Sequence, residues 1–256
     1  LLFLHPQLNT LTIMQIHISD LVKKFGDKTA VDIPDFTINS GDMLGLVGNN
    51  GAGKTTLFRL LLDLIKADEG QVTMSRQEED GTLTEIDPAK SEDWKAFTGA
   101  YIDEGFLIDF LTPEEYFHFI GKVNGLTEQE TDERVDGFSH FMNGEILGQK
   151  KLIRNFSAGN KQKIGIISAM LNAPKLLILD EPFNFLDPSS QNHLKNILTE
   201  YNAQTGATVL ISSHNLTHTV DISGRIALLE SGRIIKDLTN TDNSAEKELE
   251  DYFNIQ

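Results

Sequence analysis

A glycine-rich loop at residues 48–56 constrains the fold more than any other part of the chain. It follows an apolar run, residues 43–47, and precedes a helical pattern, which is the strand–loop–helix context of a phosphate-binding loop. Glycines let the backbone wrap a polyphosphate so that successive N–H groups point at it, and the following helix adds the positive end of its dipole. A chance match is on the order of 1%. The candidate phosphate-binding residues are Gly48, Asn49, Asn50, Gly51, Ala52, Gly53, Lys54, Thr55 and Thr56.

A second motif supplies two carboxylates. The apolar run at residues 176–179 ends in Asp180 and Glu181, which places both acids at the carboxyl edge of a sheet, where α/β folds bind ligands. With a phosphate loop, Lys54 would reach the β- and γ-phosphates of a bound polyphosphate, and Thr55 and Asp180 would hold Mg²⁺. Glu181 could polarise the attacking water as a general base. Alone, such a pair of acids more often leaves the core for solvent; joined to the loop, the catalytic interpretation is favoured.

The apolar runs and the helical patterns alternate along the chain. Short runs of this kind are typical of strands buried on both faces, and helices are predicted at residues 55–65 and 191–201. This alternation predicts a doubly wound α/β core with a mainly parallel sheet. The predicted core strands are residues 43–47, 176–179 and 208–211.

Other segments follow different patterns. Residues 91–163 contain no strand of the buried type and are mostly helical, which indicates a helical subdomain inserted into the core. Residues 75–88 are predicted to form a solvated hairpin tip between short strands. Residues 237–256 are polar and then weakly amphipathic, and we expect a terminal helix packed on the domain.

Charge and composition exclude several classes of function. The chain has 22 basic and 38 acidic residues, a formal charge of −16, so nucleic acid is not expected as a main partner. It has no cysteine, which excludes disulfides and thiolate metal sites. No stretch approaches the about 18 to 20 apolar residues needed to cross a bilayer, so we expect no direct membrane insertion.

Because strand-like alternation begins at Met14, we expect the functional start there and a poorly ordered extension over residues 1–13.

The residues around these motifs resemble the ABC-transporter ATPase family, in order and spacing, from Met14 to about residue 235. In that family an aromatic ring at the position of Phe25 stacks on adenine. The resemblance implies a P-loop, RecA-like α/β core with a mainly parallel sheet, an N-terminal antiparallel β subdomain and an inserted helical subdomain. The ATPase domain would span residues 14–236. The further positions that carry the resemblance are Asp103, Ser157, Gly159, Asp187 and His214.

The resemblance also implies roles for these positions. Ser157 and Gly159 would present a helix N-terminus to the γ-phosphate bound on an opposite subunit. Asp187 would link the two sites, and His214 would hold the attacking water together with Glu181. The product would be a head-to-tail pair of ATPase subunits with two nucleotides in the seam. We expect a homodimer, although the sequence does not decide between identical and different chains.

Several of these positions have a simpler structural interpretation, and two motifs depart from the family pattern. Taken alone, Phe25 would be a packed strand residue, His214 a polar cap and Asp187 a turn former. The signature has Ala158 and Asn160 where the family has glycine and glutamine, so we expect weakened but working γ-phosphate contacts.

Asp103 stands where the family has glutamine, although the alignment could slip by one residue to Glu104. An acid here is similar to the bacitracin- and lantibiotic-exporter branch, and it could still bind Mg²⁺ or water.

These expectations define one main hypothesis. The chain would be a cytoplasmic ATPase subunit, peripheral at the inner face of the cell membrane, that powers export of a drug, peptide or lipid-like substrate through a separate transmembrane permease. The permease contact would lie near residues 105–119, where core packing is the alternative for most apolar side chains; the candidates are Phe106, Leu107, Phe110 and Tyr116.

Two alternatives remain open. A soluble ABC ATPase of translation or DNA repair is less expected, because the chain has one such domain, no heptads and no basic tract. A regulatory subunit that binds ATP without turnover is disfavoured because Lys54, Asp180, Glu181 and His214 are all present, although the altered signature keeps it open.

Overall fold

The computed structural model describes residues 14–77, 80–214, 216–241 and 244–254. The expected N-terminal extension, residues 1–13, lies outside the described residues, as does part of the expected hairpin tip. No helix in the described part of the chain is long and apolar enough to cross a membrane.

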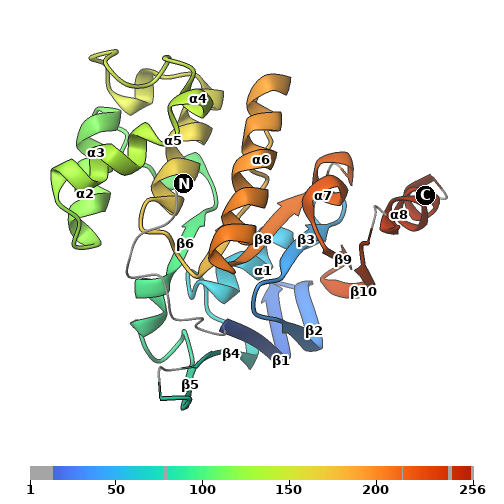
Figure 1. Cartoon of the computed structure of the whole chain (residues 1–256). Helices are drawn as coiled ribbons and strands as arrows, with labels where there is room; N and C mark the ends of the chain where they lie inside the picture. Colours follow the sequence, from blue (N-terminus) through green and yellow to red (C-terminus); the bar gives the residue numbers. More distant parts are fainter. Residues whose placement is uncertain (1–13, 78–79, 215, 242–243, 255–256) are drawn as a thin grey trace.

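A six-stranded sheet forms the centre of the fold (Figure 1). Its order is β10-β9-β3-β8-β7-β6, and all neighbouring pairs from β9 to β6 are parallel, whereas β10 pairs antiparallel at one edge. The predicted α/β core with a mainly parallel sheet is therefore confirmed. The strands are β3 (Met43–Val47), β6 (Thr98–Tyr101), β7 (Leu176–Leu179), β8 (Thr208–Ser213), β9 (Arg225–Glu230) and β10 (Arg233–Thr239).

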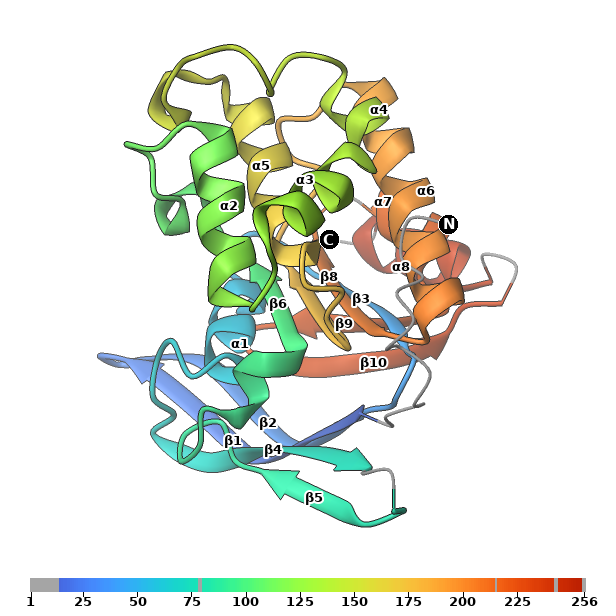
Figure 2. The same ribbon diagram turned by 60° about the vertical axis from the view of Figure 1, so that its left-hand side comes forward.

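The central strands β3 and β7 are apolar at every position because both faces of the sheet are covered. In β7, Leu177 and Leu179 pack with the helices of one layer, whereas Leu176 and Ile178 face the opposite cluster. That second cluster contains α1 (Lys54–Leu61), which lies between the central sheet and a second sheet (Figure 2).

The second sheet is antiparallel, which confirms the expected N-terminal β subdomain. Its order is β2-β1-β4-β5, and its apolar face joins the cluster around α1. The strands are β1 (Met14–Phe25), β2 (Lys28–Ile38), β4 (Glu69–Gln77) and β5 (Leu83–Ile86). The strand alternation predicted from Met14 and the short strands around the hairpin are present.

A group of helices lies at one end of the central sheet (Figures 1 and 2). Two of them, α2 and α3, begin at capping boxes. In each box the two side chains accept hydrogen bonds from backbone N–H groups that have no partner within the helix; the pairs are Thr112 with Glu115 and Thr127 with Glu130. These elements are η2 (Glu104–Phe106), α2 (Pro113–Val123), α3 (Glu128–Asp136), α4 (Ser139–Met142), η3 (Ile153–Asn155) and α5 (Ala158–Met170).

The expectation of no core strand between residues 91 and 163 is wrong over four residues. After the short helix η1 (Asp93–Phe97), β6 pairs in parallel with β7 and forms the edge of the central sheet. This strand was not predicted because Gly99 and Ala100 have no large apolar side chain, so residues 98–101 do not form the apolar run that is typical of a buried strand.

The remaining helices cover the sheet and close the chain. They are α6 (Pro188–Thr205), α7 (Leu216–Ile222) and α8 (Ala245–Asn254). In α8, Ala245 and Leu249 are buried against Val220 and Leu228, so the terminal helix packs on the domain as predicted.

Replacing Leu249 with Ala is expected to lower the free energy of unfolding by about 2–5 kcal/mol, because Leu249 is fully buried in this cluster. Urea denaturation would measure the loss. Lys247→Ala on the exposed face of α8 is the control and should change stability little. Equal effects of the two substitutions would contradict the packing of α8.

Candidate functional site

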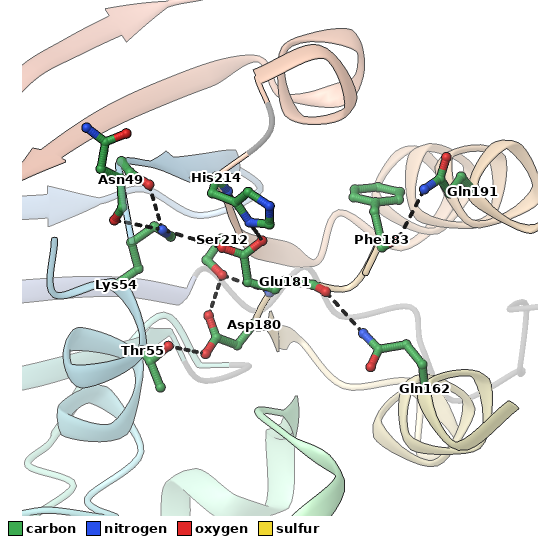
Figure 3. A network of polar contacts seen from close by, with 11 residues as sticks. Asn49, Lys54, Thr55, Gln162, Asp180, Glu181, Phe183, Gln191, Ser212 and His214 are labelled. Carbon is green, nitrogen blue, oxygen red and sulfur yellow. Dashed lines mark hydrogen bonds and ion pairs between the residues drawn. The ribbon is translucent and has the colours of Figure 1, made fainter. Parts of the chain in front are cut away.

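Three loops meet where β3, β7 and β8 end (Figure 3). The glycine-rich loop follows β3, Asp180 and Glu181 follow β7, and Ser212 and His214 lie at the end of β8. The strands are parallel neighbours, so their carboxyl ends bring together side chains that are far apart in the sequence.

The glycine-rich loop has the backbone of a phosphate cradle. Gly51 and Gly53 have φ values of 82° and 113°, which side-chain-bearing residues rarely adopt, and Gly53 directly precedes α1. At Gly48 an added Cβ would lie 2.3 Å from the carbonyl oxygen of Leu229. The loop therefore needs glycine at these positions, and it ends at a helix N-terminus that favours anions.

Lys54 is folded back onto this loop. Its side chain is buried, and its Nζ donates to the carbonyl oxygens of Gly48 at 2.6 Å and Asn49 at 3.3 Å. The ammonium group thus lies inside the cradle, where its charge is available to a bound anion.

Asp180 connects the start of α1 to the end of β8. Thr55 Oγ1 donates to Asp180 Oδ2 at 2.5 Å, and the Ser212 hydroxyl donates to Asp180 Oδ1. Ser212 Oγ also accepts from the backbone N–H of Glu181 at 2.8 Å. Burial raises the pKa of Asp180, although the hydrogen bonds from Ser212 and Thr55 act in the opposite direction.

Glu181 lies between two basic side chains. Its Oε1 is 3.4 Å from Lys54 Nζ, and its Oε2 is 2.8 Å from His214 Nδ1 and accepts from the His214 N–H at 3.3 Å. The backbone of Glu181 has a φ of 48°, an uncommon conformation that clusters at functional sites. The structure thus brings together Lys54, Glu181 and His214, three of the predicted site residues.

The predicted signature segment begins a helix as expected. Ser157 is the N-cap of α5 and accepts from the N–H of Asn160 at 3.2 Å. An added Cβ at Gly159 would lie 2.6 Å from the carbonyl oxygen of Phe185, so the two backbones approach closely. Further along α5, Gln162 Nε2 donates to the carbonyl oxygen of Glu181 at 3.1 Å and ties this helix to the site (Figure 3).

Asp187 is the N-cap of α6, where it accepts from the N–H groups of Ser189 and Ser190. The hydrogen bond from the Ser190 hydroxyl holds the pKa of Asp187 below its usual value. The expected turn role is present, and the link across a dimer stays a prediction.

Two predicted site residues lie at the borders of the site. Phe25 is exposed and borders the depression formed by the glycine-rich loop and Glu181. Asp103 borders the hollow that contains Asp180, and its carboxylate pairs with Arg59 at 3.1 Å. Their roles toward adenine and Mg²⁺ stay predictions.

Sequence reasoning missed Ser212, Gln162 and Arg59. Ser212 is fully buried at a strand end. Gln162 stands within the signature motif. Their positions next to predicted strands and motifs were weak indications that both belong to the site. Arg59 lies one helical turn after Thr55, which places both on one face of α1.

The residues present fit a nucleotide with Mg²⁺. No three His, Cys, Asp or Glu side chains converge as a metal cage in the part of the chain that the structure describes. The hydroxyl of Thr55 and the carboxylate of Asp180 are adjacent oxygen donors of the kind that Mg²⁺ prefers, and such ions usually take further ligands from water and phosphates.

Comparisons with known proteins agree with this geometry. A family model described as ABC transporter matches residues 31–184. The linearmycin resistance ATP-binding protein LnrL of Bacillus subtilis (strain 168) is 33% identical over 223 residues, which cover 87% of this chain and 68% of that protein. The bacitracin transport ATP-binding protein BcrA of Bacillus licheniformis is 31% identical over 227 residues, covering 87% and 69%. The methionine import ATP-binding protein MetN of Rhizobium johnstonii (strain DSM 114642 / LMG 32736 / 3841) is 28% identical, covering 87% and 60%.

Solved structures share the fold. An ATP-binding subunit of an ABC transporter superimposes with a TM-score of 0.75 at 27% identity, covering 91% of this chain and 92% of that one. The dimeric structure of MJ0796, a bacterial ABC transporter cassette, gives a TM-score of 0.74 at 20% identity, covering 88% and 99%.

The raised pKa of Asp180 predicts a pH dependence of stability without Mg²⁺. Because the folded pKa lies above the unfolded value of about 3.8, this group stabilises the fold below that pH, and the contribution is lost as pH rises through the folded pKa. Asp180→Asn should remove this dependence, so the variant should gain stability relative to the parent chain as pH rises from 4 to about 7.

Urea unfolding at several pH values measures the difference, with Asp109→Asn at an exposed carboxylate as the control. A stability difference between Asp180→Asn and the parent chain that does not vary with pH would contradict the effect of burial.

Proposed function

The chain belongs to the ABC transporter family, and from this premise we propose that it binds ATP with Mg²⁺ and hydrolyses it to power transport through a separate membrane-spanning subunit. The observation that carries the proposal is the position of the Glu181 carboxylate, held between the ammonium group of Lys54 and the imidazole of His214. This arrangement offers a phosphate-binding cation, a base and an orienting group within one site.

The chain's own residues have separate tasks in this reaction. Bound MgATP supplies a γ-phosphoryl group whose charge is partly neutralised by the metal. Lys54 would exchange the carbonyl oxygens of Gly48 and Asn49 for phosphate oxygens. Thr55 and Asp180 would hold the metal.

Glu181 would accept the proton of the attacking water, and His214 would fix the carboxylate through its 2.8 Å contact. Since Lys54 would turn toward phosphate, the Glu181 carboxylate would then be free of its present 3.4 Å ion pair.

A second ATPase subunit, expected to be another copy, would complete each site. Ser157 and Ala158 are exposed at the N-terminus of α5, so the amides there can face an anion held by another molecule. Support comes from MJ0796, a neighbour in fold that is dimeric. Phe25, which borders the cradle, would stack on adenine, and Asp187 would link the two sites.

We propose export as the direction of transport, with a drug, peptide or lipid-like substrate. The relatives at 33% and 31% identity are named for linearmycin resistance and bacitracin transport, whereas the methionine import relative is 28% identical. The chain would then act at the inner face of the cell membrane, in the cytoplasm.

The contact with the membrane subunit is proposed on the outer side of η2 and α2. Phe106, Phe110 and Phe119 are 51%, 65% and 46% exposed, an unusual concentration of large apolar side chains for a free surface. Leu107 and Tyr116 are buried in the core, so the packing alternative holds for these two. The exposed phenylalanines would enter the apolar part of the interface.

Substitutions of Lys54 and Glu181 test the reaction. Lys54→Ala should abolish nucleotide binding, because it removes the cation of the cradle. Glu181→Gln should retain binding but lower the turnover number by at least about 100-fold, because the amide cannot accept a proton. Equilibrium binding and steady-state phosphate release measure the two effects.

Glu181→Gln should also accumulate an ATP-dependent dimer in size-exclusion chromatography. Lys66→Ala, an exposed lysine beyond the end of α1, is the control. Turnover by Glu181→Gln near the parent rate, or failure of this variant to dimerise with ATP, would count against the proposal.

A substitution in the loop between η2 and α2 tests the contact with the membrane subunit. Phe110→Ser should leave the ATPase rate of the isolated chain within about twofold, since Phe110 is 65% exposed. It should weaken co-purification with a polytopic membrane protein that stimulates this ATPase. Leu83→Ser, 59% exposed on β5, is the matched control and should retain the partner. Loss of the partner in both variants, or in neither, would contradict this docking surface.

A further inference from the structure

Two adjacent acids after β6 pair with two different helices. Asp103 Oδ2 is 3.1 Å from Arg59 Nη2 on α1, and Glu104 Oε2 is 3.1 Å from Lys161 Nζ on α5. One helix begins at the phosphate cradle and the other at the signature segment, because α1 begins at Lys54 and α5 begins just after Ser157. The acids therefore connect the phosphate cradle to the signature segment through charge.

Both oxygens of the Asp103 carboxylate are already engaged. Oδ2 meets Arg59, and Oδ1 accepts from the N–H of Gly105 at 2.8 Å, which makes Asp103 the N-cap of η2. A metal at Asp103 would have to compete with an arginine and a backbone N–H. Arg59 also has a buried Nε that makes no hydrogen bond within the described residues.

The segment that carries the acids is anchored at its start. The N–H of Asp180 donates to the carbonyl oxygen of Tyr101 at 2.9 Å, which fixes the end of β6 to the loop that begins at Asp180. The ring of Tyr101 lies against α5 at Gly165, where an added Cβ would come within 2.1 Å of the ring. With its start fixed, the segment holds the two acids between α1 and α5.

We propose that the pairs Asp103–Arg59 and Glu104–Lys161 form an ion clasp that sets the orientation of α5 relative to α1, and that Asp103 is a positioning residue in place of a ligand of Mg²⁺. The expected effect on turnover rests on the proposed function. The energetic coupling between the charged side chains does not depend on that function. Because the Arg59 and Asp103 side chains are 38% and 46% exposed, the clasp is moderate in strength and sensitive to salt.

A charge-reversal cycle tests the clasp. Arg59→Asp and Asp103→Arg should each lower the turnover number about two- to fivefold, the range for a partly exposed ion pair. The KM for ATP and the Mg²⁺ concentration for half-maximal rate should stay within about twofold, because neither side chain is in the cradle. The double variant should recover the parent turnover number to within about twofold.

A ligand role for Asp103 predicts the opposite pattern. Asp103→Arg and the milder Asp103→Asn would then raise the half-maximal Mg²⁺ concentration more than about tenfold, and Arg59→Asp would not restore it. That result would overturn the proposal, as would additive effects of the two reversals on turnover.

A second measurement separates this inference from the proposed function. In the nucleotide-free chain, the urea midpoints of Arg59→Gln, Asp103→Asn and the double variant should be non-additive whether or not the chain hydrolyses ATP. If the changes in urea midpoint are additive, the ion clasp is wrong. If the parent chain folds but has no ATPase activity, only the proposed function is wrong, and the urea midpoints of these variants still test the clasp. Lys236→Gln, which breaks a 2.6 Å pair with Glu248 of similar exposure far along the chain, is the matched control and should leave turnover unchanged.

Discussion

The buried carboxylate of Asp180 holds the site together. A charge at the end of a core strand is unfavourable unless hydrogen bonds satisfy it, and here the hydroxyls of Thr55 in α1 and Ser212 in β8 do so. Ser212 Oγ also accepts a hydrogen bond from the backbone N–H of Glu181. One acid therefore fixes the start of α1, the end of β8 and the backbone of Glu181, the proposed base. Any change that moved β7 would disturb all three loops at once.

The same arrangement explains why Glu181 tolerates an uncommon backbone conformation. With φ at 48°, the residue is held by Ser212 at its N–H, by Gln162 at its carbonyl oxygen and by Lys54 and His214 at its carboxylate. Such over-determination keeps strained residues in place. Because Gln162 belongs to α5, the position of Glu181 is also coupled to the helix that carries the signature segment.

The sequence was most informative where contiguous residues carry the information. The loop at residues 48–56 and the acids after β7 are local patterns, and β3 and β7 were predicted at their observed residues. β6 was missed because Gly99 and Ala100 leave no apolar run at a sheet edge. Arg59 was missed because its partner Asp103 lies 44 residues away, and no local pattern reports which cation a given acid will meet. The roles of Phe25, Asp103 and Asp187 toward a nucleotide stay predictions.

The acid at position 103 changes the kind of coupling that this segment can provide. The glutamine expected from the family pattern is neutral and can donate or accept, so it can exchange partners as a site opens and closes. A carboxylate only accepts, and here Asp103 accepts from Arg59, which lies one turn after Thr55 on α1. Glu104 pairs with Lys161. In a chain with a formal charge of −16, each of these two acids has a local cation, and the proposed connection between α1 and α5 is electrostatic.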